Sequence, residues 1–152
     1  MLADKENILA LSKSILEEGK KVKITVNGTS MYPLLKDGDQ VEIEKTPLEA
    51  LKIGDIVVFE NLNRWLAHRL IKIKKNDGRF TLITKGDSCI KFDAAIAEEA
   101  YIGKVTAFYR ADNKYGISEK SIQIFQKRII RSNGLMNYLF YFLKFLKVKF
   151  GV

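Results

Sequence analysis

Short apolar runs separated by turn residues fill the middle of the chain. Polar and apolar residues alternate in the first two runs, as they do in strands with one buried face. Asn76-Asp77-Gly78 lies between two later runs and is a strong hairpin signal. This spacing of short strands favours a mainly β fold, a coiled antiparallel sheet or partly open barrel. The predicted strands are Lys21–Val26, Gln40–Glu44, the continuously apolar Asp55–Phe59, Leu66–Lys74, Arg79–Thr84 and Ala100–Arg110.

One helix is predicted before the strands, over residues 4–18. Ile8, Leu11 and Ile15 recur there at helical spacing with Leu16 beside them, and Gly19 is a stop signal. The apolar residues never form the continuous core of a signal peptide or the length of a membrane span. We therefore interpret this segment as an amphipathic helix of a globular domain, with no N-terminal signal or transmembrane anchor.

Two further helices are predicted at the C-terminus, over 118–131 and 135–150. Residues 118–152 contain seven Lys or Arg and one Glu, a net charge of +6 within the chain's +8. The second helix is rich in phenylalanine, and Lys144 and Lys147 fall together on one of its faces, so it is amphipathic. Helices that lie on a membrane surface have this pattern. Packing on the sheet or on a second copy of the protein is the other interpretation. We divide the chain into a domain at 1–115 and a basic tail at 116–152.

Composition excludes several classes of function. The 152 residues fit one domain, and 47% hydrophobic residues suffice for a packed core. One Cys excludes an internal disulfide, and one His with one Cys cannot supply the usual ligands of a metal site, so we expect no metal and no cofactor. No Gly-rich phosphate loop occurs. The basic residues are interleaved with phenylalanines in the tail, so no nucleic-acid partner is expected.

The most informative stretch is Asn27-Gly28-Thr29-Ser30-Met31-Tyr32-Pro33, directly after a predicted strand. Asn27-Gly28 can take positive φ and turn the chain sharply, and Pro33 fixes φ three residues after Ser30, so the Ser30 hydroxyl can be held in one exposed position. A serine becomes a nucleophile only beside a base that a third group orients. His68 is the only histidine in the chain, and the loop from Thr84 to Asp93 carries two aspartates.

Four ordered blocks make the chain similar to the type I signal peptidases, from about Val26 to Tyr109. His68 occupies the place where most bacterial members, and the self-cleaving repressors of the same fold, have a lysine. The chain therefore resembles the endoplasmic-reticulum and archaeal branch, which uses histidine and aspartate. The blocks are Ser-Met-Tyr-Pro at 30–33, Gly-Asp-Ile-Val-Val-Phe at 54–59, His68-Arg69 and Thr-Lys-Gly-Asp at 84–87.

The resemblance implies a role for each candidate residue. Ser30 would be the nucleophile and His68 the base. The acid of this branch lies six residues beyond the aspartate of the fourth block, which is Asp93 here. Asp87, the aspartate of the block itself, would support the loop. The sequence alone leaves open whether Asp93 or Asp87 approaches His68.

The oxyanion formed during attack needs hydrogen-bond donors, and the backbone N–H of Ser30 is the nearest. Its neighbours Gly28, Thr29 and Met31 are the other candidates for oxyanion or substrate binding. Some signal peptidases have a serine hydroxyl two residues before the nucleophile, and Gly28 stands at that position. Cys89 could act as a nucleophile with His68, but a single cysteine is usually a small buried apolar residue.

We therefore expect a serine endopeptidase that cleaves a leader or precursor peptide. We expect it at the membrane surface, which it would contact through residues 135–150, or in the cytoplasm. Two alternatives remain open from the residues. One is an inactive peptide- or membrane-binding module on the same fold, and the other is a repressor-like peptidase that cleaves itself.

Overall fold

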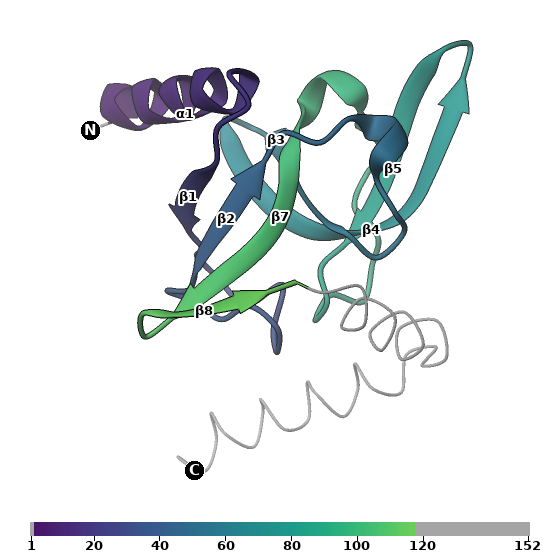
Figure 1. Ribbon diagram of the computed structural model, residues 1–152. Helices are drawn as coiled ribbons and strands as arrows, with labels where there is room; N and C mark the ends of the chain where they lie inside the picture. Colours follow the sequence, from purple (N-terminus) through teal and green to yellow (C-terminus); the bar gives the residue numbers. More distant parts are fainter. Residues whose placement is uncertain (1, 118–152) are drawn as a thin grey trace.

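A computed structural model describes residues 2–117, which form one N-terminal helix and a curled antiparallel sheet (Figure 1). The order of strands in the sheet is β1-β2-β7-β3-β4-β5-β6, with β8 paired to β7. The predicted mainly β fold with an N-terminal helix is confirmed, whereas the two predicted C-terminal helices lie outside the described residues. The elements are α1 (Leu2–Glu17), β1 (Val22–Thr25), β2 (Gln40–Glu44), β3 (Ile56–Asn61), β4 (Arg64–Asn76), β5 (Arg79–Lys85), β6 (Ile96–Ala97), β7 (Tyr101–Arg110), β8 (Asn113–Gly116) and the short 3-10 helices Leu48–Ala50 and Glu98–Ala100.

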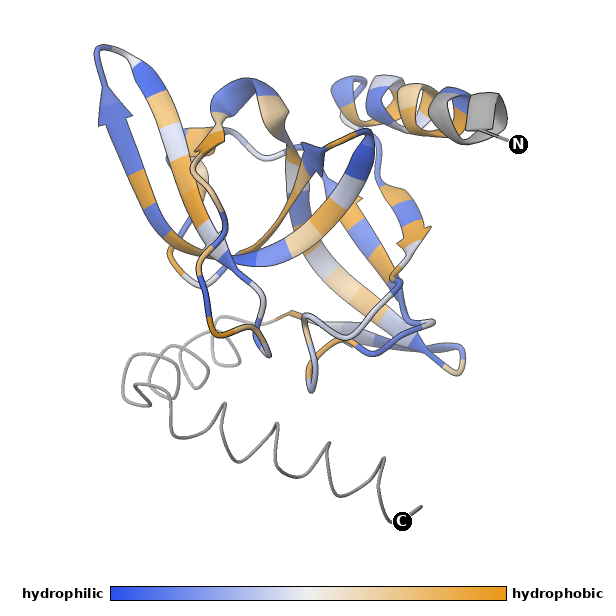
Figure 2. Ribbon diagram, turned by 180° about the vertical axis from the view of Figure 1, so that it is seen from behind, coloured by the Kyte–Doolittle hydropathy of each residue, from blue (hydrophilic) through white to orange (hydrophobic). Residues whose placement is uncertain are grey.

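Strand β3 lies between the two halves of the core and explains the continuous apolar run in the sequence. Ile56 and Val58 are buried in one cluster with residues of β2 and β7, and Val57 and Phe59 are buried in a second with residues of β4 and β5. Successive side chains of a strand point to opposite faces, so a strand buried on both faces must be apolar throughout. Elsewhere in the sheet, polar and apolar residues alternate along the strands (Figure 2).

The sheet curls because its pairing is interrupted by register shifts. The pairing shifts between Glu42 and Ile43 of β2, between Val58 and Phe59 of β3, and within β4 near Leu70. Such irregularities bend a strand and increase its twist. The chain turns back sharply at the predicted Asp77-Gly78 hairpin, where both residues have positive φ. As a result, the segment between β1 and β2 and the segment after β5 lie at the same end of the sheet (Figure 1).

Helix α1 packs on the sheet through the side that carries Leu16. Leu16 is fully buried in the first cluster and Ser12 is almost fully buried, whereas Ile8 and Leu11 are each more than 60% exposed. The apolar spacing therefore predicted the helix but not its orientation. The chain leaves α1 at Gly19, whose φ of 75° suits glycine, and enters β1 three residues later. This short connection allows only the last turns of α1 to reach the core.

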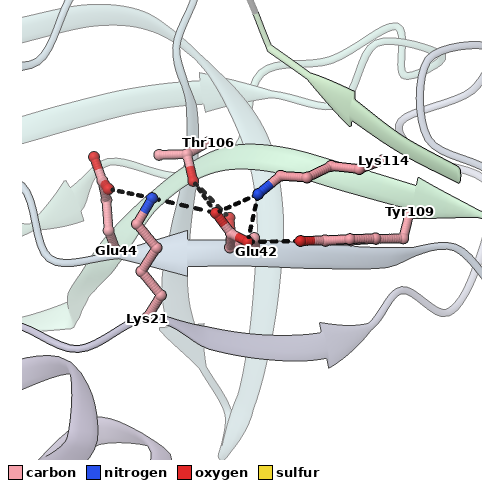
Figure 3. Close-up of polar contacts among 6 residues, drawn as sticks. All are labelled: Lys21, Glu42, Glu44, Thr106, Tyr109 and Lys114. Atoms are coloured by element: carbon pink, nitrogen blue, oxygen red, sulfur yellow. Dashed lines mark hydrogen bonds and ion pairs between the residues drawn. The ribbon is translucent and has the colours of Figure 1, made fainter. Parts of the chain in front are cut away.

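Glu42 of β2 is the centre of a polar network on the sheet surface (Figure 3). Its carboxylate accepts a hydrogen bond from the Tyr109 hydroxyl at 2.8 Å. The ammonium groups of Lys114 and Lys21 lie 3.0 and 3.2 Å from its oxygens. These donors lower the Glu42 pKa from 4.5 to about 2, with the largest effect from Tyr109. The network ties β2 to β7, β8 and the residue before β1.

We predict that Glu42→Gln lowers the free energy of unfolding at pH 7 by roughly 1–3 kcal/mol, because a neutral amide binds two ammonium groups poorly. A carboxyl whose pKa is lowered by folding stabilises the fold above its unfolded pKa. The stability difference between wild type and variant should therefore shrink as the pH falls from 4.5 to about 2. Denaturant unfolding at several pH values measures this. Glu44→Gln, at a half-exposed neighbour that contacts Lys21, is the control and should change stability by about 0–1 kcal/mol. A pH-independent difference would contradict the prediction.

Candidate active site

Ser30 lies in the loop between β1 and β2, and buried neighbours fix the position of this loop. The N–H of Gly28, a residue with φ of 96°, donates to Asp37 Oδ1 at 2.7 Å and so closes the loop. Met31 and Leu35, both 2% exposed or less, pack in the first core cluster and are linked by a backbone hydrogen bond. The chain on both sides of Ser30 is therefore anchored.

His68 lies on β4 directly opposite Val57 of β3 and is 7% exposed. Its Nε2 is 3.0 Å from Ser30 Oγ, and its Nδ1 is 2.7 Å from Asp93 Oδ2. The fold thus joins three of the predicted site residues into one chain of hydrogen bonds. Strand β4 supplies His68, while Ser30 and Asp93 come from the two loops at the same end of the sheet.

This arrangement determines which ring nitrogen carries the proton. An ionised carboxylate can only accept hydrogen bonds, so its contact with Asp93 places the proton of the neutral imidazole on Nδ1. The Nε2 atom then accepts the hydrogen bond from the Ser30 hydroxyl. A serine oxygen in this arrangement can lose its proton to the ring as it attacks an electrophile, and the carboxylate stabilises the imidazolium that forms.

Asp87 makes a different contact. Its two carboxylate oxygens each lie 2.7 Å from the Arg69 guanidinium, at Nε and at Nη2. The remaining Arg69 nitrogen, Nη1, donates to the Gly54 carbonyl at 2.7 Å. Burial raises the pKa of the Asp87 carboxyl, whereas the Arg69 hydrogen bonds act in the opposite direction. Asp87 is thus bonded to Arg69, and it is Asp93 that contacts His68.

Residues 86–88 bind directly to the loop that carries Ser30. The Ser88 N–H donates to the Ser30 carbonyl at 2.9 Å, and its hydroxyl donates to the Thr29 carbonyl at 2.7 Å. Gly86 packs so closely that an added Cβ would lie 2.8 Å from Ser30 O and 3.1 Å from Ser30 Cβ. Sequence reasoning assigned no role to Ser88.

Sequence reasoning also assigned no role to Thr84, at the end of β5. Its hydroxyl donates to Asp93 Oδ2 at 2.6 Å, the same oxygen that contacts His68. The only signal in the sequence was that Thr84 opens the Thr-Lys-Gly-Asp block, six residues after the Gly78 turn.

The residues predicted to bind the oxyanion or the substrate lie next to Ser30 and differ in their contacts. The Gly28 N–H is engaged by Asp37, the Thr29 carbonyl accepts from Ser88, and the Met31 side chain is in the core. Among the described residues, no acceptor is hydrogen-bonded to the Ser30 N–H. This amide therefore stays the candidate oxyanion donor.

Cys89 is poorly suited to act as the nucleophile. Burial, and then the charge of Asp93, raise the pKa of its thiol. Since the thiolate is the reactive form, this environment lowers the reactivity of the sulfur. Within residues 2–117 no group of His, Cys, Asp and Glu side chains could hold a metal ion.

The family model described as Peptidase S24-like matches residues 2–106, more than two thirds of the chain. The chain belongs to this family. The match spans Ser30, His68 and Asp93, and it places the S24-like chain in the S24/S26 superfamily of serine peptidases. A search of curated proteins finds no match. No helix in the described part of this S24-like chain is long and apolar enough to cross a membrane.

We predict that removing either partner of the Arg69–Asp87 pair costs roughly 3–5 kcal/mol of stability, because an unpaired charge stays buried. Arg69→Met and Asp87→Leu should each have this effect, while the double variant regains most of the loss. Unfolding by denaturant measures the four proteins. Glu49→Gln breaks an exposed ion pair with Lys75 and should change stability by less than about 0.5 kcal/mol. Strictly additive effects of the two single variants would contradict the prediction.

We predict that Gly86→Ala slows the reaction of Ser30 with a fluorophosphonate, a reagent for activated serines, by about tenfold or more. The added methyl would press on the Ser30 backbone, and small displacements of a nucleophile are costly. The labelling rate, followed by mass spectrometry, measures this. Gly116→Ala is the control, because nothing lies within 4 Å of its added Cβ. Equal rates for wild type and both variants would contradict the prediction.

Proposed function

We propose that the chain is a serine endopeptidase that cleaves a leader or precursor peptide, with Ser30, His68 and Asp93 as its catalytic residues. The observation that supports this most directly is the continuous contact Ser30 Oγ to His68 Nε2 and His68 Nδ1 to Asp93 Oδ2, at 3.0 and 2.7 Å. Membership of the Peptidase S24-like family supports the same reaction class.

In the proposed reaction, Ser30 Oγ attacks the carbonyl carbon of the scissile peptide bond while His68 Nε2 accepts the hydroxyl proton. The Ser30 N–H stabilises the oxyanion. The protonated ring then delivers the proton to the leaving amine, which departs as the new N-terminus. A water molecule, activated by the same nitrogen, hydrolyses the acyl-enzyme and restores Ser30.

The proposed substrate follows from the signal peptidase resemblance. His68 beside Arg69, with an acid six residues after Asp87, is the pattern of the endoplasmic-reticulum and archaeal branch, whose members cleave after small side chains. We propose the same preference here. The basic, phenylalanine-rich composition of segment 135–150 supports contact with an anionic membrane surface. We propose that the peptidase binds its precursor substrate there.

The experiment is cleavage of a peptide library by the full chain, comparing wild type with Ser30→Ala, His68→Gln and Asp93→Asn. Each variant should lose roughly three orders of magnitude or more in kcat/KM, because the three groups act as a unit. Ser88→Ala is the matched control, since it removes a serine hydroxyl from the same site without touching the triad. It should lower the rate much less than Ser30→Ala.

Two outcomes would replace the proposal with another function. If wild type cuts no peptide and its Ser30 does not react with a fluorophosphonate, the chain is a binding module on a peptidase fold. If it cuts no peptide but a truncated species accumulates in wild type and not in Ser30→Ala, as seen by intact mass, the chain is a self-cleaving peptidase. Cleavage that survives Ser30→Ala would refute the assignment of the nucleophile.

A further inference from the structure

Within residues 2–117, Thr84 is the one side chain besides His68 that is hydrogen-bonded to the Asp93 carboxylate. It is fully buried on β5 and pairs with Leu70 of β4, two residues from His68. Its hydroxyl donates to Asp93 Oδ2 at 2.6 Å, and its carbonyl accepts a hydrogen bond from the Asp93 N–H at 2.9 Å. Asp93 is therefore bonded to Thr84 through both its main chain and its side chain.

Asp93 needs such an anchor. It lies in an irregular segment after β5, and its side chain is 26% exposed. The last torsion of an aspartate has broad preferences, so a carboxylate on a loop can rotate and present either oxygen. Thr84, by contrast, is a β-branched residue with a restricted χ1 in a paired strand. Its hydroxyl is thus a fixed donor on the strand pair that also carries His68.

Two hydrogen bonds converge on Asp93 Oδ2. One is the donation from Thr84, and the other is the donation from His68 Nδ1 at 2.7 Å. A donor to an ionised carboxylate stabilises the charged form. An ionised Asp93 carboxylate with Oδ2 directed at His68 keeps the imidazole proton on Nδ1. The Nε2 atom is then able to take the proton of Ser30.

We propose that Thr84 is a positioning residue for the proposed peptidase reaction: its hydroxyl orients the Asp93 carboxylate and thereby fixes the tautomer of His68. The inference rests on the proposed function for its consequence in catalysis. Its structural part, the tautomer, can be measured whether or not the protein cleaves peptides.

The test uses the full chain and the ring nitrogen chemical shifts of His68 in NMR spectra. Because the chain contains one histidine, these signals are unambiguous. Wild type should show predominantly the tautomer with the proton on Nδ1. Thr84→Val keeps the shape but removes the hydroxyl, so a larger share of the tautomer protonated on Nε2 is expected. Thr84→Ser keeps the hydroxyl and should resemble wild type.

Thr81→Val is the matched control. Thr81 lies on the same strand but, three residues away, faces the other side of the sheet, so its substitution should leave the His68 signals unchanged. The fluorophosphonate reaction of Ser30 should slow by about tenfold or more in Thr84→Val and stay within about threefold of wild type in Thr84→Ser. A purely structural role for Thr84 would change stability without this pattern.

A wild-type tautomer in folded Thr84→Val would overturn the proposal. If Thr84→Val does not fold, Thr84→Ser decides the question, and a tautomer different from wild type would overturn it. Failure of the proposed function is seen separately. In that case Ser30 in the wild type would not react with the fluorophosphonate, while the tautomer would still respond to removal of the Thr84 hydroxyl.

Discussion

The buried ion pair between Arg69 and Asp87 joins the parts of the candidate site that come from distant segments. Arg69 directly follows His68 on β4, so its side chain points to the opposite face of the strand from the imidazole. Asp87 lies between two residues that contact the Ser30 loop, Gly86 and Ser88. The pair therefore fixes the strand of the base against the loop that supports the nucleophile. A buried pair needs further hydrogen bonds to offset the loss of solvent, and Arg69 donates one to the Gly54 main-chain carbonyl.

Asp87 and Asp93 are the same residue type in two different environments. Asp87 has a fully buried side chain and is bonded to a permanent cation, so its charge has a fixed structural partner. Asp93 retains some contact with solvent and is bonded to an imidazole, whose charge can change. In the proposed reaction, only the second arrangement can respond to a proton arriving from Ser30.

Much of the fold could be predicted because its elements carry local signals. The continuous run in β3 and the Asp77-Gly78 turn are such signals, and both were confirmed. The turns at Leu62-Asn63 and Ala111-Asp112 also have positive φ at both residues but contain no glycine, so sequence gave little indication of them or of β8. The spacing of Ile8, Leu11 and Ile15 predicted helix α1 but not which apolar residues reach the core, because the short connection after Gly19 decides which side meets the sheet.

The residues of the candidate site also include some that the sequence indicated and some that it did not. Ser30, His68 and Asp93 could be named because four blocks in the order of a known family assign a role to each, and the structure brings the three side chains together. Thr84 and Ser88 could not, because a threonine in a strand and a serine in a loop are ordinary residues there. Their importance arises from distances across the fold, 2.6 Å to a carboxylate and 2.7 Å to a carbonyl. Residues that react can be recognised by chemistry, whereas residues that orient them become visible only when strand register and loop packing are known.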